Sequence, residues 1–279
     1  MSVSIGTDPE LFLKDSRTGG VVPVCGLIGG AKGKPLDLGD GYGVQEDNVM
    51  LEFNTPPCND PYAFADSVKI GVEKCLDLVH TRHPHLEFDN GSERLFSFPQ
   101  LDNLQARQFG CSQDFDAYEH GAAFTPVNPE ELNDDDGAWR FAGGHVHLGY
   151  DNPHNIPDFV VASFADVFLG LPSVGLDNQP KRRELYGAPG RYRPTSYGIE
   201  YRVLSNFWVM DFSLAEQIGY RAYNLGSFIE SSSEDRLQTL FKEIPWADVC
   251  RAMKDEDAER AADILAFVRH DLDVNEVDV

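Results

Sequence analysis

One stretch of the sequence, Ala142-Gly-Gly-His-Val-His-Leu-Gly-Tyr150, indicates a β-strand that carries chemically active side chains. Side chains two residues apart on a strand share a face, so His145 and His147 are expected to point the same way. The glycines on either side would let a ligand approach the backbone closely. Two imidazoles aimed in one direction suggest a site for a metal ion or a phosphate group.

Two further pairs of polar residues have the same spacing. Glu200 and Arg202 lie two apart on a strand-like run whose other face is apolar, and Asp8 and Glu10 lie two apart near the start of the chain. If these faces converge in one sheet, the chain carries a cavity lined with carboxylate, imidazole and guanidinium groups. That set of groups is typical of a site for metal ions and a nucleoside triphosphate.

Residues 44–55 resemble one long strand, on which Leu51 and Phe53 face a hydrophobic layer and Glu52 lies on the polar face. The preceding residues 25–43 contain seven glycines and are expected to form a mobile loop. They do not form a Walker loop, because Lys32-Gly-Lys-Pro35 lacks the Gly-Lys-Ser/Thr ending. We therefore interpret these glycines as turns or as a lid.

A helix is predicted over residues 60–83 from the spacing of its apolar residues, with Asp60 as N-cap and Pro61 at its first position. No repeat, low-complexity linker or convincing boundary divides the chain. We therefore expect a single catalytic domain over 1–279, with a motif-bearing sheet region over 1–208 and a helical part over 209–279. The other expected elements are strands in 86–98 and 139–150, a loop over 110–137, a helix over 156–171, a basic loop over 181–193 and helices after residue 211.

Composition narrows the class of protein. The hydrophobic content of 42% in 279 residues allows a substantial core, and five scattered cysteines without CxxC spacing indicate reduced thiols rather than a disulfide framework or a zinc knuckle. A formal net charge of -23 argues against a surface that binds nucleic acid. No basic segment followed by an apolar stretch opens the chain, so we expect a soluble, cytoplasmic protein.

The ordered motifs resemble a known superfamily, the glutamine-synthetase-like enzymes. More closely, the set is similar to the carboxylate-amine ligases, or type 2 amidoligases, found in phage genomes. The resemblance spans roughly residues 4–208. It depends on Glu10, the Glu52 strand ending in Asn-Thr-Pro-Pro, the Gly-His-Val-His strand, an arginine-rich loop with Tyr-Gly-Ala-Pro-Gly, and the run Gly-Ile-Glu-Tyr-Arg.

This resemblance implies a fold and a reaction. The fold would be of the α+β class: an antiparallel, partly closed β-sheet with helices packed on its outer face, as in the catalytic domain of glutamine synthetase. The reaction would be ATP-dependent amide formation through an acyl phosphate, with Mg²⁺ as metal and Mn²⁺ as the alternative. The partners would be small-molecule or peptide carboxylates and amines. The protein would lie in the host cytoplasm if a phage encodes the chain. Whether the chain forms a homo-oligomer is left open.

The resemblance also implies a role for individual residues. His147 would lie near the phosphates, and Arg202 would contact a transferring phosphoryl group or a substrate carboxylate. Which of Glu46, Asp47 and Glu52 coordinates is left open, and Asp47 or Glu46 is a candidate general base. The implied metal ligands are Asp8, Glu10, Glu52, His145 and Glu200, and the implied phosphate-stabilising arginines are Arg183 and Arg193.

Two other functions remain open from sequence alone. A metal-dependent hydrolase could use His145 and His147 with carboxylates to activate water, and a catalytically silent protein could bind a nucleotide or a metal. Each motif also has a structural interpretation: histidines satisfy buried polar groups, and Arg202 beside Glu200 could be a solvated ion pair. The arginine-rich loop favours the ligase, because a hydrolase of neutral amides has no need of many guanidinium groups.

Overall fold

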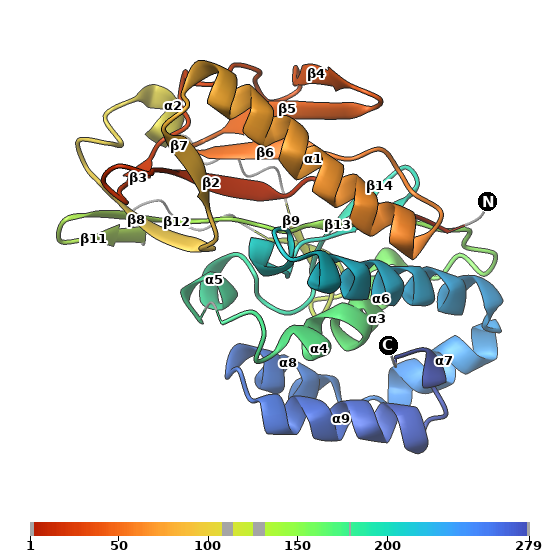
Figure 1. Cartoon of the computed structure of the whole chain (residues 1–279). Helices are drawn as coiled ribbons and strands as arrows, with labels where there is room; N and C mark the ends of the chain where they lie inside the picture. Colours follow the sequence, from red (N-terminus) through yellow and green to blue (C-terminus); the bar gives the residue numbers. More distant parts are fainter. Residues whose placement is uncertain (1–2, 108–113, 125–131, 179, 278–279) are drawn as a thin grey trace.

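The computed structural model describes residues 3–107, 114–124, 132–178 and 180–277. Within them the chain is of the α+β class, with curved antiparallel sheets and helices packed against them (Figure 1), which confirms the predicted class. The closer likeness to the glutamine synthetase fold stays a prediction, as does the division into 1–208 and 209–279. No helix in the described part of the chain is both long enough and apolar enough to cross a membrane.

The described strands form three sheets. The first sheet has the order β1 (Ser4–Thr7), β13 (Val146–Gly149), β15 (Gly198–Tyr201), β14 (Arg191–Thr195), β9 (Asp114–Asp116) and β10 (Ala122–Phe124). The second has the order β3 (Val21–Val22), β2 (Glu10–Asp15), β6 (Met50–Asn54), β5 (Tyr42–Asp47) and β4 (Leu36–Gly39), and β7 (Leu86–Asp89) also pairs with β2. The third joins β11 (Asn133–Asp134), β12 (Gly137–Phe141) and β8 (Glu93–Ser97).

The first two sheets meet at the short corner between β1 and β2. β1 ends at Thr7 and β2 begins at Glu10, and Pro9 between them has no N–H to continue a ladder. The corner is bonded to both sides: Glu10 N donates to Gly143 O at 2.9 Å, and Phe53 N donates to Pro9 O at 3.2 Å. A single bent segment therefore carries residues from one sheet into the other.

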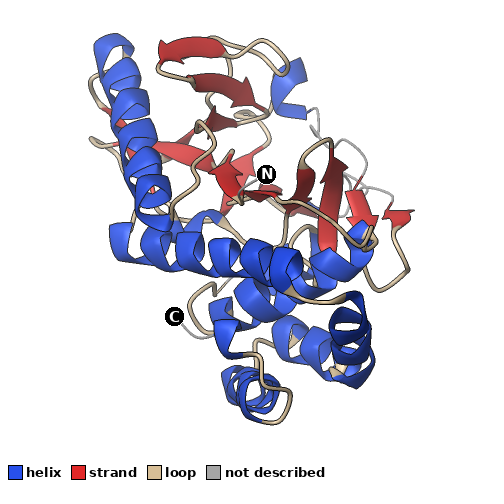
Figure 2. Cartoon of the chain, turned by 90° about the vertical axis from the view of Figure 1, so that its right-hand side faces the viewer, coloured by secondary structure: helices blue, strands red, loops and turns tan. Residues whose placement is uncertain are grey.

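Helices cover one side of these sheets. The predicted helix is present as α1 (Pro61–Arg82), and its N-cap Asp60 accepts a hydrogen bond from Ala63 N at 2.9 Å. Figure 1 shows α1 and α6 (Phe212–Ser231) side by side, and Figure 2 shows helices along one side of the strands. The other helices are α2 (Leu104–Arg107), α3 (Asp158–Ala165) with a π-helical turn at Asp166–Gly170, α4 (Leu171–Ser173), α5 (Pro180–Leu185), α7 (Glu234–Glu243), α8 (Trp246–Lys254), α9 (Ala258–His270) and 3₁₀ turns at Asn206–Trp208 and Asn275–Val277.

A continuous cluster of buried apolar side chains runs from the strands to the C-terminal helices. Gly71 of α1 shows how closely the layers approach, because a Cβ at this position would lie 2.4 Å from the ring of Phe53 on β6. Cys25, Cys58, Cys75 and Cys250 are free thiols, as expected. Cys111 lies outside the described residues.

Several predicted elements were wrong in detail. Residues 44–55 form the hairpin of β5 and β6 rather than one strand, because Asn48 adopts a φ of 57° and the chain reverses there. Residues 139–150 contribute to two strands in different sheets, with His145 directly before β13. The expected loops also contain regular structure: β4 in 25–43, β9, β10 and β11 in 110–137, and α5 with the start of β14 in 181–193.

Candidate active site

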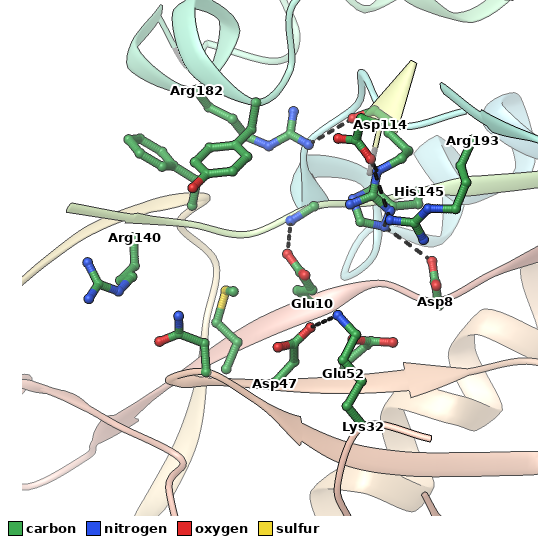
Figure 3. Close-up of a pocket in the computed structure, with 16 residues that line it drawn as sticks. Asp8, Glu10, Lys32, Asp47, Glu52, Asp114, Arg140, His145, Arg182 and Arg193 are labelled. Atoms are coloured by element: carbon green, nitrogen blue, oxygen red, sulfur yellow. Dashed lines mark hydrogen bonds and ion pairs between the residues drawn. The ribbon is translucent and has the colours of Figure 1, made fainter. Parts of the chain in front are cut away.

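A cavity of about 250 Å³ lies where the first two sheets meet, and Figure 3 shows its lining. Carboxylates from the β1–β2 corner and from the β5–β6 hairpin face arginines and a histidine from the first sheet. Apolar and polar side chains complete the wall on one side. The lining residues are Asp8, Glu10, Lys32, Asp47, Asn48, Met50, Glu52, Asp114, Arg140, Phe141, Gly143, His145, Arg182, Tyr186, Arg193 and Arg202.

Asp8, His145 and Glu200 form a first group of potential metal ligands. One ligand atom from each of the three lies within 4.8 Å of the others. His145 Nδ1 lies 3.3 Å from Asp8 Oδ1 and 3.5 Å from Glu200 Oε1. Antiparallel pairing explains the convergence. Gly6 on β1 and Glu200 on β15 both stand opposite His147 on β13. Asp8 follows Gly6 by two residues and His145 precedes His147 by two, so both reach the side of the sheet on which Glu200 lies.

Glu10, Asp47 and Glu52 form a second group, again with one atom from each within 4.8 Å of the others. Glu10 on β2 stands opposite Glu52 on β6, and Glu52 stands opposite Gln45 on β5. Gln45 Nε2 donates to Glu52 Oε1 at 2.9 Å. Asp47 lies two residues beyond Gln45 and therefore on the same face of β5.

Glu46 does not belong to either group. Its carboxylate accepts hydrogen bonds from the backbone N–H groups of Gly26 (2.7 Å), Ile28 (2.9 Å) and Gly29 (2.7 Å). Burial by itself would raise the pKa of Glu46, but these bonds and one from Gln105 hold it below its ordinary value. Glu46 is therefore an anchor for the glycine-rich segment, and among the three acids left open by the sequence, Asp47 and Glu52 are the ones that face the cavity.

The second group is electrostatically costly without a cation. Burial raises the pKa of Glu52 well above its ordinary value, and the carboxylates of Asp8, Glu10 and Asp47 raise it further. Burial also raises the pKa of Glu10, with His145 opposing the shift. A bound divalent ion would relieve this repulsion, and a set of carboxylate oxygens is the donor chemistry that Mg²⁺ and Mn²⁺ prefer. The residues present therefore fit such an ion.

In the first group the carboxylates are already stabilised as anions. Burial would raise the pKa of Asp8, but His147 and His145 together hold it well below its ordinary value. Burial would also raise the pKa of Glu200, but Arg202, His145 and His147 together lower it below its ordinary value. The first group thus supplies ionised oxygen ligands near neutral pH from the β1–β2 corner and the first sheet.

Two arginines flank the first group. Arg202 donates to Glu200, and its Nε lies 2.9 Å from Asp114 Oδ1. Arg193 stands opposite Glu200 on β14, with 2.9 Å between Nη1 and Glu200 Oε2 and 3.4 Å between Nη2 and Asp114 Oδ1. Asp114 was missed from sequence because it lies in the expected loop of 110–137. Its one signal was its spacing of two from Asp116, which is typical of a strand.

Arg183 is placed differently from the expectation. Its side chain is 1% exposed, donates to Ser173 Oγ at 3.1 Å and pairs with Asp177 at 3.6 Å, and it does not line the cavity. Its neighbour Arg182 does line the cavity, although no role was expected for it. Consecutive residues of a helix point in different directions, and both arginines lie in α5 rather than in an open loop.

His147 lies behind the first group. Its Nε2 is 3.0 Å from Asp8 Oδ1, its Nδ1 bonds to the Tyr197 hydroxyl, and the two rings stack with centroids 6.1 Å apart. Burial would lower the pKa of His147, but Asp8 reverses the effect and raises it. In the described part of the chain, neither ligand group contains both His145 and His147. This geometry favours an orienting role for His147 and argues against one metal held by the two histidines.

The site thus combines two groups of potential metal ligands with fixed guanidinium groups. Residues 138–245 match the family described as Phage phiEco32-like COOH.NH2 ligase-type 2, which confirms the resemblance found in the motifs. The matched segment contains His145, Glu200, Arg193 and Arg202, and the family supports an amide-forming carboxylate-amine ligase. No curated protein matches the chain.

Proposed function

We propose that this protein is an ATP- and Mg²⁺-dependent carboxylate-amine ligase that works through an acyl phosphate. One observation carries the proposal: two groups of potential metal ligands open onto one cavity, and Arg193 and Arg202 stand beside one of them. The family match over residues 138–245 supports the type of bond that is formed. Mn²⁺ would substitute for Mg²⁺, since oxygen-rich sites accept both ions.

In the proposed reaction, a carboxylate oxygen of the acid attacks the γ-phosphorus of ATP, and ADP leaves. The amine nitrogen then attacks the acyl carbon, inorganic phosphate leaves, and the nitrogen loses a proton. Phosphoryl transfer of this kind needs positioning and charge neutralisation more than covalent help from the protein. Bound at the two groups, Mg²⁺ would neutralise and orient the phosphate oxygens of ATP.

The side chains of the cavity would divide this work. Asp8, His145 and Glu200 would hold one ion, and Glu10, Asp47 and Glu52 another. Membership of the second group favours a ligand role for Asp47 over the general-base role expected from sequence. Arg202 and Arg193 would stabilise charge on the transferring phosphoryl group, while Arg183, which is buried against Asp177, takes no part in this proposal.

The metal-dependent hydrolase is the weaker candidate. It required His145 and His147 to act on one ion, but both ring nitrogens of His147 have protein partners, Asp8 and Tyr197. Arginines close to the ligand groups also suit a nucleotide better than a neutral amide. A catalytically silent binding protein would keep the ions and the nucleotide but show no turnover.

The test is to incubate the purified protein with ATP, Mg²⁺ and pools of amino acids, small carboxylic acids and amines, and to follow ADP and phosphate. We expect release that requires both an acid and an amine. Glu200→Gln and His145→Ala should lower it by about a hundredfold or more while leaving the circular dichroism spectrum unchanged. Release of AMP and pyrophosphate, or hydrolysis that does not need an amine, would contradict the proposal.

A further inference from the structure

The glycine-rich segment before β4 ends in a narrow hairpin whose tip reaches the cavity. Ala31 N donates to Lys34 O at 3.1 Å, and Lys34 N donates to Ala31 O at 2.7 Å, which closes the tip around Lys32 and Gly33. All four residues are exposed. Lys32 lines the cavity, whereas Lys34 does not.

The base of this hairpin is anchored. Besides the three N–H groups held by Glu46, the Ile28 carbonyl accepts from Arg82, and the Leu27 carbonyl contacts His83 Nε2 at 3.2 Å. Gly30 follows with a φ of 78°, and a Cβ there would lie 2.6 Å from Val44 O, so the backbone packs closely on β5. The anchors fix where the tip stands, and the long Lys32 side chain supplies the freedom to move.

Lys32 contacts the second ligand group. Its Nζ lies 3.6 Å from Asp47 Oδ2, and this pair is visible in Figure 3. The Lys32 side chain is 54% exposed, but that of Asp47 is only 13% exposed. The ammonium thus lies at the mouth of a group whose carboxylates repel one another.

The two ligand groups are neutralised by cations of different kinds. Glu200 in the first group is held by Arg193 on β14 and by Arg202 directly after β15, whose side chains are 26% and 14% exposed. Planar guanidinium groups on a sheet keep their position, whereas an exposed lysine is a mobile point charge on a four-carbon stem. A divalent ion and the ammonium would repel each other by several kT at about 4 Å, so the binding of either one at Asp47 weakens the binding of the other.

We propose that Lys32 is a displaceable counter-ion of the cavity: it holds Asp47 while the Glu10–Asp47–Glu52 group lacks a metal ion, and it turns to a phosphate oxygen of the nucleotide when an ion binds there. This inference rests on the proposed function. Before a metal ion binds, the Lys32 ammonium compensates the charge of the Asp47 carboxylate. After the ion binds, the same ammonium contacts the nucleotide. Lys32 is therefore a nucleotide-contacting residue that competes with the metal.

The experiment compares Lys32→Gln with Lys34→Gln, which removes the same charge from the same hairpin outside the cavity. Mn²⁺ binding without nucleotide is measured by electron paramagnetic resonance. Binding of the non-hydrolysable β,γ-methylene analogue of ATP is measured by calorimetry at saturating Mg²⁺. Thermal unfolding confirms that each variant folds like the wild type.

We expect opposite signs. Lys32→Gln should bind Mn²⁺ about twofold to fivefold more tightly, the range set by one partly exposed ion pair, and bind the analogue several-fold more weakly. Lys34→Gln should change neither affinity. In an Asp47→Asn background, Lys32→Gln should no longer affect Mn²⁺, because the competed ligand is gone.

Unchanged or weaker Mn²⁺ binding in Lys32→Gln overturns the inference, and so does analogue binding equal to that of Lys34→Gln. A wild type that fails to bind the analogue at all would contradict the proposed function. The Mn²⁺ comparison would still decide whether Lys32 and the metal compete for Asp47, so the two failures can be told apart.

Discussion

Glu10 on β2 and Glu52 on β6 stand directly opposite each other in an antiparallel strand pair, with both carboxyl groups facing the same cavity. Like charges in this position destabilise a sheet. The pairing therefore costs folding free energy, and an ion bound between the carboxylates would recover it. Sites that keep such a cost are commonly functional.

Replacing Glu52 by glutamine should stabilise the metal-free protein and weaken its metal binding. Removal of one repelling carboxylate is worth about 1 kcal/mol, or a rise in Tm of about 2–4 °C. The measurement is thermal unfolding in EDTA beside Mn²⁺ titration, with the exposed Glu73→Gln on α1 as control. A lower Tm with unchanged Mn²⁺ binding would show that Glu52 is a structural residue.

The neighbours Glu46 and Asp47 should respond in opposite ways. Glu46→Ala leaves backbone N–H groups of the anchored segment without their acceptor, so the free energy of unfolding should fall by about 2–4 kcal/mol. Asp47→Asn should change it by less than about 1 kcal/mol, because its partner Lys32 is exposed, yet it should impair Mn²⁺ binding. Urea unfolding and Mn²⁺ titration of both variants check this, and the reverse pattern would exchange the two roles.

Arg202→Lys should be damaging although it keeps the charge. The guanidinium of Arg202 reaches Glu200 and Asp114 at once, and a point charge does not reproduce that fork. We expect kcat for amide formation to fall by about a hundredfold or more. Arg191→Lys is the matched control, since Arg191 pairs with Asp116 in the same sheet but does not line the cavity. Equal losses in both variants would assign Arg202 to the support of the sheet.

A pH-dependent stability is expected from Asp166, which lies fully buried behind the first sheet in the π-helical turn. Burial raises its pKa to about 7, although hydroxyl groups of Tyr201 and Tyr118 donate to it at 2.6 and 2.7 Å. Between its ordinary value of 3.8 and about 7, the folded chain keeps a proton that the unfolded chain has lost. The free energy of unfolding therefore falls as pH rises through this window.

Asp166→Asn removes that contribution, so the variant should gain stability relative to the wild type from pH 4 to pH 8, on the order of a few kcal/mol. Urea unfolding at several pH values measures the difference. The exposed Asp77→Asn on α1 should show a difference that is constant with pH. A constant difference for Asp166→Asn as well would mean that Asp166 is ionised throughout.

The parts of the site that sequence reasoning found depend on local geometry. Alternation along a strand determines which side chains share a face, and this was enough for Glu200 with Arg202. Asp8 and Glu10 also line one cavity, but Asp8 lies in the corner before β2, and the two residues belong to different ligand groups. Those four residues surround the cavity, or in the case of Glu200 contact its wall. The α+β class followed from the resemblance of the same motifs to a known superfamily.

The parts that were missed depend on pairing between distant residues or on one backbone angle. The left-handed conformation of Asn48 turned a supposed strand into a hairpin, and only this reversal places Asp47 beside Glu52. Asp114 meets Arg202 because β9 pairs with β14, which no local pattern specifies. The expected position of Arg183 was wrong because α5 is a short helix and not a loop. Consecutive residues of a helix point in different directions, so Arg182 and Arg183 face different surroundings.

The most direct test of the central claim follows an oxygen atom. The protein is given ATP, Mg²⁺, an amine pool and acids labelled with ¹⁸O in their carboxylates, and the products are analysed by mass spectrometry. Attack on the γ-phosphorus predicts ¹⁸O in inorganic phosphate alongside ADP and the new amide. Label in AMP would indicate attack on the α-phosphorus, and unlabelled phosphate would indicate plain hydrolysis of ATP; either result would contradict the acyl-phosphate ligase.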